Sequence, residues 1–144
     1  MLKELTIGNS VKHNNVTFKV YAISEAMPDK SIHYNNEATL TIQNAGLITV
    51  RLDEISGIRI ESWMLFNYGF EYKKSGDKII PVLPIGSFAG ISLIGLIDPE
   101  GKVNVIPSQI VLGEEDAILV ETYGRTEIKF LHELENFIKF SKYL

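Results

Sequence analysis

Residues 79–97 read IIPVLPIGSFAGISLIGLI, an apolar stretch without a single charged residue. Its length approaches the ~20 apolar residues that a membrane-spanning helix requires. Two prolines, Pro81 and Pro84, would break the hydrogen bonds of such a helix, and unpaired backbone groups are costly in lipid. The sequence therefore predicts no membrane span. It predicts buried β-structure instead, with one strand over 79–83 and a second over 90–97.

Both predicted strands are apolar on both faces, so both faces need cover. The C-terminal helix can cover one side, and the N-terminal part of the chain or another protein must cover the other. We therefore expect the stretch to be partly an interface with a second copy or with another protein. The residues assigned to this interface are Ile85, Phe88, Ile91, Leu93, Ile94 and Leu96. A phosphate-binding loop is not indicated, because the segment lacks the Lys and Ser/Thr that grip phosphate and magnesium.

The N-terminal part of the chain shows the alternation of apolar and polar residues that is typical of half-buried strands. Residues 5–22 alternate on both sides of Asn14 and Asn15, and paired asparagines suit a tight hairpin turn. Two more short alternating runs, 38–42 and 48–52, flank a further turn. Several short strands joined by tight turns predict a small SH3-like β-barrel over residues 1–58.

A short helix is predicted next, from an N-cap at Ser62 to a stop at Gly69. It carries Trp63, Phe66 and Tyr68, whose spacing favours a helical stripe packed into the core. A surface for stacking or peptide docking is the alternative interpretation of these three aromatic residues.

The rest of the chain predicts hairpins and a terminal helix. A turn at 98–101 joins two strands, and a second hairpin is expected between 117–123 and 126–130. A helix should begin at Leu131. The fold class is therefore α+β, with a barrel subdomain over 1–58 and a second subdomain over 59–144 that holds the short helix, an antiparallel sheet and the C-terminal helix.

Composition restricts the functional classes. The chain has 144 residues, 45% of them hydrophobic, and a net charge of −4 with no basic stripe. Phosphate contacts supply most of the affinity of nucleic-acid binders, so this charge balance weighs against nucleic acid as a partner. There is no cysteine, which excludes disulfides and thiolate metal sites. The N-terminus lacks the apolar run of a signal peptide, so we expect a cytoplasmic protein.

No group of residues predicts chemistry. The three histidines, His13, His33 and His132, lack the further ligands of a structural metal site, and are expected to be solvated or to cap a helix. No serine lies in a nucleophile motif such as G-x-S-x-G. The sequence therefore predicts no enzyme, no cofactor and no metal.

Three stretches together resemble a family of small hypothetical proteins from gut Bacteroidales genomes and their phages. They are residues 4–9 (ELTIGN), 63–70 (WMLFNYGF) and 128–137 (IKFLHELENF). Members of that family open with E-L-x-I-G-N-x-V, carry W-L-x-x-F-G-F in the middle and end with a V-H-x-L-Q-N-like helix. The family has no assigned activity or catalytic residue. The resemblance implies a phage or mobile-element setting, in the host cytoplasm or in a virion.

These observations predict a non-enzymatic protein–protein interaction or assembly protein, with a minor or auxiliary virion component as the form that the resemblance implies. Its partners would be other protein subunits, either copies of itself or different chains. The alternative is a nucleic-acid-binding accessory factor that uses the small barrel. An enzyme is the third hypothesis, and it lacks any assembled motif.

Overall fold

The computed structural model describes residues 5–24, 39–85, 91–112, 116–122 and 127–141. The chain forms two compact units. Unit 1 comprises Met1–Ile58 and Leu131–Asn136, and unit 2 comprises Arg59–Phe130 and Phe137–Leu144. The chain thus passes from unit 1 to unit 2 after residue 58, where the sequence predicts the end of the first subdomain. Residues 131–136 belong to unit 1, although the sequence places them in the second subdomain.

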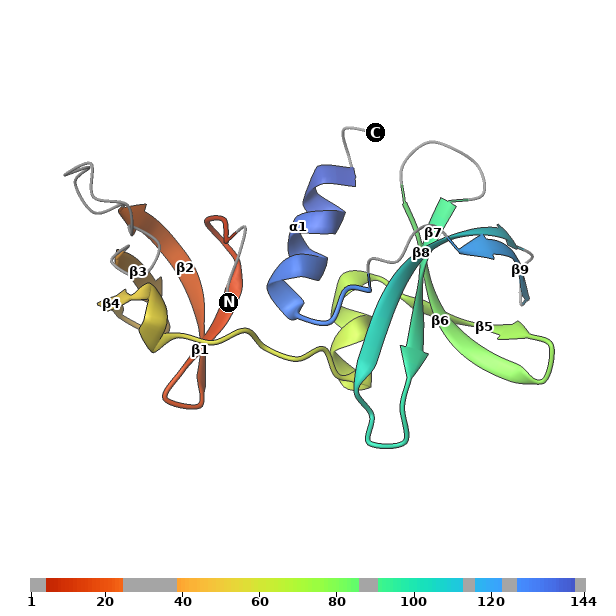
Figure 1. Ribbon diagram of the computed structural model, residues 1–144, viewed down its shortest axis with the longest axis horizontal. Helices are drawn as coiled ribbons and strands as arrows, with labels where there is room; N and C mark the ends of the chain where they lie inside the picture. The colour runs from red at the N-terminus through yellow and green to blue at the C-terminus, as the bar shows by residue number, and fades with distance from the viewer. Residues whose placement is uncertain (1–4, 25–38, 86–90, 113–115, 123–126, 142–144) are drawn as a thin grey trace. The chain divides into compact units, whose positions relative to one another are not determined.

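Unit 1 is built on a four-stranded antiparallel sheet, drawn in red to yellow in Figure 1. Its strands follow one another in chain order as β1 (Ser10–His13), β2 (Val16–Ser24), β3 (Thr39–Gln43) and β4 (Leu47–Arg51). The turn residues explain this meander. Asn14 and Asn15 have φ of 49° and 62°, the left-handed values that a two-residue hairpin loop needs and that asparagine tolerates.

The core of unit 1 comes from the inward-facing positions of these strands. Its buried members are Val11, Val20, Leu40, Ile42, Val50 and Ile55, with Leu5, Phe18 and Leu52 packed against them. Burial alternates most clearly along β3, where Leu40 and Ile42 are buried between less buried neighbours, as the sequence pattern predicts. The first part of the sequence prediction, short alternating strands joined by tight turns, is therefore confirmed.

The predicted SH3-like barrel is not confirmed. In the part of the chain that the structure describes, no pairing joins β1 to β4, so the sheet is open. A short 3₁₀ helix, η2 (Leu52–Glu54), follows β4. Beyond it, the backbone of Ser56 exchanges two hydrogen bonds of 2.9 Å with Lys12 of β1.

Unit 2 contains a five-stranded antiparallel sheet, again in chain order. Its strands are β5 (Glu71–Ser75), β6 (Lys78–Pro84), β7 (Ile91–Ile97), β8 (Val103–Leu112) and β9 (Ala117–Thr122). The predicted strands within 79–97 are confirmed as β6 and β7. Lys74 of β5 forms an isolated bridge with Asp116, just before β9, so the two edges of the sheet approach each other and the sheet is curled.

Turn chemistry again explains the hairpins of unit 2. Gly76 has φ of 63° between β5 and β6, and Gly101 has φ of 84° between β7 and β8. Asp98 fixes the second turn, because its carboxylate accepts hydrogen bonds of 2.9 Å from the backbone N–H groups of Glu100 and Lys102. The predicted turn at 98–101 is confirmed.

The predicted hairpin between 117–123 and 126–130 is wrong in its second strand. Residues 127–130 form no strand, and the structure instead gives isolated bridges from Ile128 to Val105 and from Phe130 to Arg59. The first bridge pairs this segment with β8, and the second pairs it with the residue that follows Ile58 at the end of the first part of unit 1. The predicted terminal helix is confirmed as α1 (Leu131–Ser141), with Leu131 and Leu134 buried.

Gly95 of β7 sits where a side chain has no room. A Cβ there would lie 2.7 Å from Cγ of Pro81 and 3.1 Å from Cγ1 of Val103. The proline ring cannot rotate away, so Gly95→Ala is expected to cost about 1–3 kcal/mol through overpacking. Urea unfolding monitored by circular dichroism would measure this.

The matched control is Gly46→Ala, because a Cβ at Gly46 would meet nothing within 4 Å and the residue does not have a positive φ. The control variant should unfold within about 0.5 kcal/mol of the wild type. If Gly95→Ala were as stable as the wild type, the close approach of β6 to β7 at this point would be contradicted.

Candidate functional site

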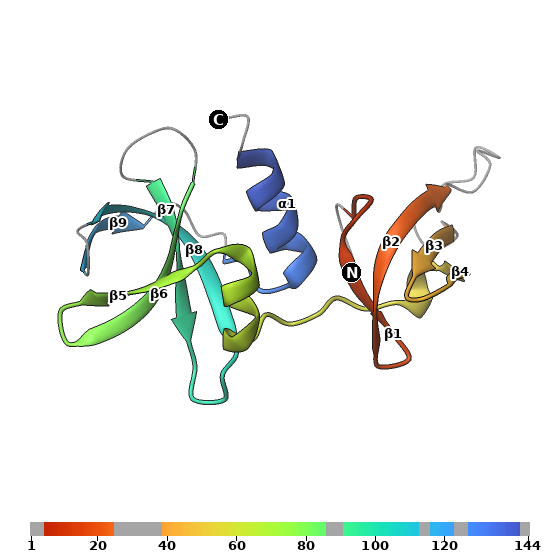
Figure 2. The same ribbon diagram turned by 180° about the vertical axis from the view of Figure 1, so that it is seen from behind.

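Two aromatic side chains of unit 2 project into solvent. They lie on η3 (Ser62–Tyr68), a 3₁₀ helix seen as the yellow-green coil in Figures 1 and 2. Trp63 is 67% exposed and Phe66 is 83% exposed, whereas Met64 and Leu65 are buried. We call Trp63 and Phe66 the aromatic pair.

The favoured prediction, a core stripe, is therefore wrong for Trp63 and Phe66. The spacing correctly groups the two rings on one line of the helix, but it does not determine which line faces the core, because Met64 and Leu65 are apolar too. A 3₁₀ helix has three residues per turn, so positions three apart eclipse each other. Trp63 and Phe66 share the outer line, while Leu65 and the partly buried Tyr68 share another. The helix begins after Glu61 instead of Ser62, and it ends at Gly69, with φ of 89°, as predicted.

The base of the aromatic pair is held by polar contacts. The indole Nε1 of Trp63 donates a 3.0 Å hydrogen bond to Oε2 of Glu61, and Lys102 Nζ donates a 2.7 Å bond to Oε1 of the same carboxylate. The backbone N–H of Ser62 donates to the carbonyl of Gly101 at 2.9 Å. The Trp63 ring is thus exposed and yet positioned, which lowers the entropy lost when a partner covers it.

Most of the residues assigned to an interface in 79–97 are buried within the chain. Ile85, Leu93 and Ile94 belong to the core, and Ile91 is partly buried. Leu96 is exposed, as is its neighbour Ile97, which the sequence did not single out. Phe88 lies outside the described residues. The structure thus uses this stretch chiefly as the core of unit 2 and leaves the end of β7 at the surface.

The exposed end of β7 lines a hollow of about 330 Å³. The hollow lies between β6 and β7, and residues 78–81 and 95–97 form its walls. We call it the fork. Ile79, Leu96 and Ile97 are exposed apolar residues in its wall, and Lys78 is the one charged residue among the lining residues.

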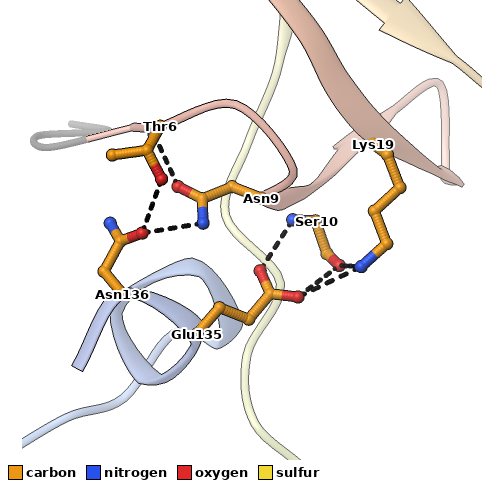
Figure 3. Close-up of polar contacts among 6 residues, drawn as sticks. All are labelled: Thr6, Asn9, Ser10, Lys19, Glu135 and Asn136. Atoms are coloured by element: carbon orange, nitrogen blue, oxygen red, sulfur yellow. Dashed lines mark hydrogen bonds and ion pairs between the residues drawn. The ribbon is translucent and has the colours of Figure 1, made fainter. Parts of the chain in front are cut away.

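A polar cluster in unit 1 was not anticipated by the sequence (Figure 3). Asn136 of α1 receives two hydrogen bonds on its Oδ1, one of 2.8 Å from the hydroxyl of Thr6 and one of 2.9 Å from Nδ2 of Asn9. Asn9 Oδ1 in turn accepts a 2.7 Å bond from the backbone N–H of Thr6. Gly8, with φ of 94°, makes the turn between these two residues possible.

The second half of the cluster is centred on Glu135. Its Oε1 accepts a 2.7 Å hydrogen bond from the backbone N–H of Ser10, and its Oε2 accepts a 2.7 Å bond from the Ser10 hydroxyl. Lys19 Nζ forms a 3.2 Å ion pair with Oε2 and donates a 2.6 Å bond to the Ser10 oxygen. Figure 3 shows these side chains from β1, β2 and α1 converging on one carboxylate.

This polar cluster holds backbone in place and offers no open reaction site. Ser10 and Asn9 are almost fully buried, so a substrate could not reach the Ser10 hydroxyl. A serine nucleophile needs access as well as a neighbouring base. The cluster instead joins the start of the chain to the first half of α1, which explains why residues 131–136 belong to unit 1.

The polar cluster joins two of the stretches that carried the family resemblance. Thr6 and Asn9 come from residues 4–9, and Glu135 and Asn136 come from residues 128–137. The signal available in the sequence was the presence of small polar residues inside otherwise apolar elements. Nothing in the sequence indicated that these two distant stretches would meet.

The histidines differ in their surroundings. His13 is partly exposed in the β1–β2 hairpin, with Nδ1 3.1 Å from the carbonyl of Glu54. His132 is buried at the start of α1, so of the two predicted alternatives the solvated one is wrong there, and the capping one stays a prediction. His33 lies outside the described residues. Within the described ranges, no three His, Asp or Glu side chains are grouped so that they could hold a metal ion.

None of the helices in the described part of the chain has the length and apolar character needed to cross a membrane. No protein-family model matches the chain, and no curated protein or solved structure matches it at a significant level. The resemblance to the Bacteroidales and phage family stays a prediction. Evidence about function therefore comes from the residues and contacts of the two units themselves.

Proposed function

We propose that this chain is a non-enzymatic protein–protein interaction or assembly protein that uses the aromatic pair as an anchor. The observation that carries the proposal is the exposure of Trp63 and Phe66 on one line of η3. Tryptophan is strongly enriched among the residues that dominate binding energy, and aromatic residues in general are enriched in the cores of interfaces.

Two features of the site support binding over incidental exposure. The hydrogen bond from Trp63 to Glu61 orders an aromatic side chain before any partner arrives. The core-facing residues Met64 and Leu65 anchor η3 to unit 2, so the aromatic pair is presented on a fixed surface. A partner of matching chemistry would offer an apolar pocket that accepts two rings.

The proposal also includes the architecture of unit 1 and the biological setting of the protein. An SH3-like barrel in unit 1 is supported by η2 and by the Lys12–Ser56 bridge, which brings the chain after β4 back to β1. The family resemblance supports a phage or mobile-element setting, with the protein in the host cytoplasm or in the virion as an auxiliary component. Mass spectrometry of purified particles tests the virion assignment, and absence of the chain from them would reject it.

The alternative function is nucleic-acid binding by the small barrel. The net charge of −4 weighs against it, because nucleic-acid binding draws much of its affinity from phosphate contacts. Titration of labelled single- and double-stranded DNA and RNA at two salt concentrations separates the two proposals. Binding that weakens steeply with salt would favour the alternative.

We expect self-association that depends on the aromatic pair. Light scattering coupled to size exclusion should give a defined oligomer for the wild type and a monomer for the Trp63→Ser/Phe66→Ser variant. Each truncation of an interface anchor costs about 2 kcal/mol or more, which is roughly a 30-fold weakening. Circular dichroism should show an unchanged fold, because both side chains are exposed.

The matched control is Tyr72→Ser, which removes another exposed aromatic side chain of unit 2, on β5. It should leave the oligomer intact. A wild-type protein that elutes as a sharp monomer at high micromolar concentration would reject self-assembly. An oligomer that is equally stable in the double variant would reject the aromatic pair as its anchor.

A further inference from the structure

The pairing between β6 and β7 stops before either strand ends. The two strands pair at Val82–Ile94, Leu83–Leu93 and Pro84–Ser92. On the other side of Val82, residues 78–81 of β6 pair only with β5. Beyond Ile94, residues 95–97 of β7 pair only with β8. Figures 1 and 2 both show the β5–β6 and β7–β8 hairpins running apart. The fork is the opening between them.

Proline ends this ladder. The backbone N–H of Ile85 donates to the carbonyl of Ile91 at 3.2 Å, which identifies a hydrogen-bonded pair. Such pairs recur at every second position of an antiparallel ladder, so the next ones fall at Leu83–Leu93 and then at position 81 opposite Gly95. Pro81 has no N–H to donate to the Gly95 carbonyl.

The next main-chain groups along both strands therefore face the fork. Two residues beyond Pro81 and Gly95, the groups that face the fork are those of Ile79 on β6 and Ile97 on β7. The β7–β8 turn independently shows which residues of β7 direct their main-chain groups toward β6. The N–H of Asp98 bonds the carbonyl of Lys102 at 2.9 Å, so the even-numbered residues of β7 bond to β8 and the odd-numbered residues face β6. Neither Ile79 nor Ile97 takes part in the β6–β7 pairing.

These backbone groups determine the class of ligand. Unpaired N–H and C=O groups on two strand edges are a template for another extended chain. Once a ligand covers them and excludes water, these groups need new hydrogen-bonding partners, which an aliphatic ligand could not supply. A peptide main chain supplies both donors and acceptors at the right spacing.

The side chains of the fork add two requirements. Its inner end is narrow, because a Cβ on Gly95 would already lie 2.7 Å from Cγ of Pro81. Ile79 and Ile97, 63% and 42% exposed, make the walls apolar. Lys78 supplies a positive charge three residues out from Pro81, about 10 Å along a strand. The matching ligand has an apolar residue against Ile79 and Ile97, outside the closed inner end, and a carboxylate that reaches Lys78.

We propose that the fork binds an extended peptide segment by strand addition, with an apolar side chain against Ile79 and Ile97 and an acidic side chain at Lys78. This inference rests on the proposed function, since it supplies a second binding site for a protein partner. It is independent of the aromatic pair in its residues, so the two can fail separately.

Selection from a displayed library of random short peptides tests the fork, with the full chain as bait and Pro81→Val for counter-selection. Valine restores the N–H that can bond Gly95, so the ladder should lengthen and the fork should close. Peptides enriched on the wild type should combine alternating apolar residues with Asp or Glu, and should bind Pro81→Val at least about tenfold more weakly by fluorescence anisotropy.

Two further variants keep the test independent of any folding defect in Pro81→Val. Lys78→Glu changes an exposed side chain and should weaken the enriched acidic peptides about tenfold. Ile97→Pro removes an N–H that faces the fork without removing a bond to β8, and should weaken them similarly. An N-methylated copy of the best peptide, which cannot donate main-chain hydrogen bonds, should not bind.

Three results would overturn the fork proposal: no peptide is enriched, enriched peptides bind all variants equally, or N-methylation has no effect. The Trp63→Ser/Phe66→Ser variant distinguishes this failure from failure of the proposed function. If that variant loses association but keeps peptide binding, the fork stands and the aromatic anchor is confirmed. If peptides fail while association through the aromatic pair persists, only the fork is rejected.

Discussion

Leu93→Asp is expected to unfold unit 2. Leu93 has no exposed surface on β7, so the variant would bury a carboxylate with no partner. A buried, unpaired charge costs far more than an exposed one, and losses above about 4–5 kcal/mol arise from this kind of substitution. Such a loss is comparable to the whole stability of a small domain. Circular dichroism would report unfolding.

Leu96→Asp is the matched control, because it makes the same change three residues along the same strand. Leu96 is 48% exposed, so its substitution should cost about 1 kcal/mol or less. The pair separates core from surface within the apolar stretch. A folded Leu93→Asp protein with a melting temperature near that of the wild type would contradict the burial of β7.

Glu135→Ala is expected to destabilise unit 1 by about 3 kcal/mol. The carboxylate accepts hydrogen bonds from both the amide and the hydroxyl of Ser10, and it is itself only 11% exposed. Hydrogen bonds to a charged group contribute about 1.5–3 kcal/mol each, and leaving a buried donor unsatisfied carries a similar cost. Native-state hydrogen exchange should show the Ser10 amide exchanging much faster in the variant.

The control for this change is Glu133→Ala, which removes an exposed carboxylate from the first turn of the same helix. As an exposed charge in the first turn, Glu133 interacts favourably with the helix dipole, an interaction that contributes about 0.3–1 kcal/mol, so the variant should lose much less stability than Glu135→Ala. Equal stability of the Glu133 and Glu135 variants, or unchanged exchange at Ser10, would contradict a structural role for the polar cluster.

The turns, the strands β6 and β7 and the start of the C-terminal helix could be predicted from the sequence. The Asn14–Asn15 turn and the Asp98 turn follow from residues that tolerate or stabilise unusual backbone angles. The prolines within 79–97 rule out a continuous helix, and β6 and β7 are the result. The start of α1 at Leu131 follows from its apolar spacing. In each case the decisive physics acts between residues close in the chain.

The predictions were wrong or incomplete where the local sequence pattern does not determine which residues meet in space. The spacing of Trp63 and Phe66 predicted a core-facing stripe, but Met64 and Leu65 of the same helix are apolar too and are the residues that are buried, so spacing alone did not determine which line faces the core. The polar cluster depends on Ser10 meeting Glu135, a contact between residues 125 positions apart. Without an account of which elements meet in space, the role of Glu135 could not be deduced from its neighbours in sequence.

The separation of Ser10 from Glu135 has a consequence for the growing polypeptide. Synthesis at about 5–20 residues per second leaves an interval of about 6–25 s between the appearance of these two residues, which are 125 positions apart. During this time the strands of unit 1 exist on the ribosome without the carboxylate that satisfies the Ser10 amide. Unit 1 therefore cannot reach its final state cotranslationally before residues 131–136 emerge, even though most of it is made first.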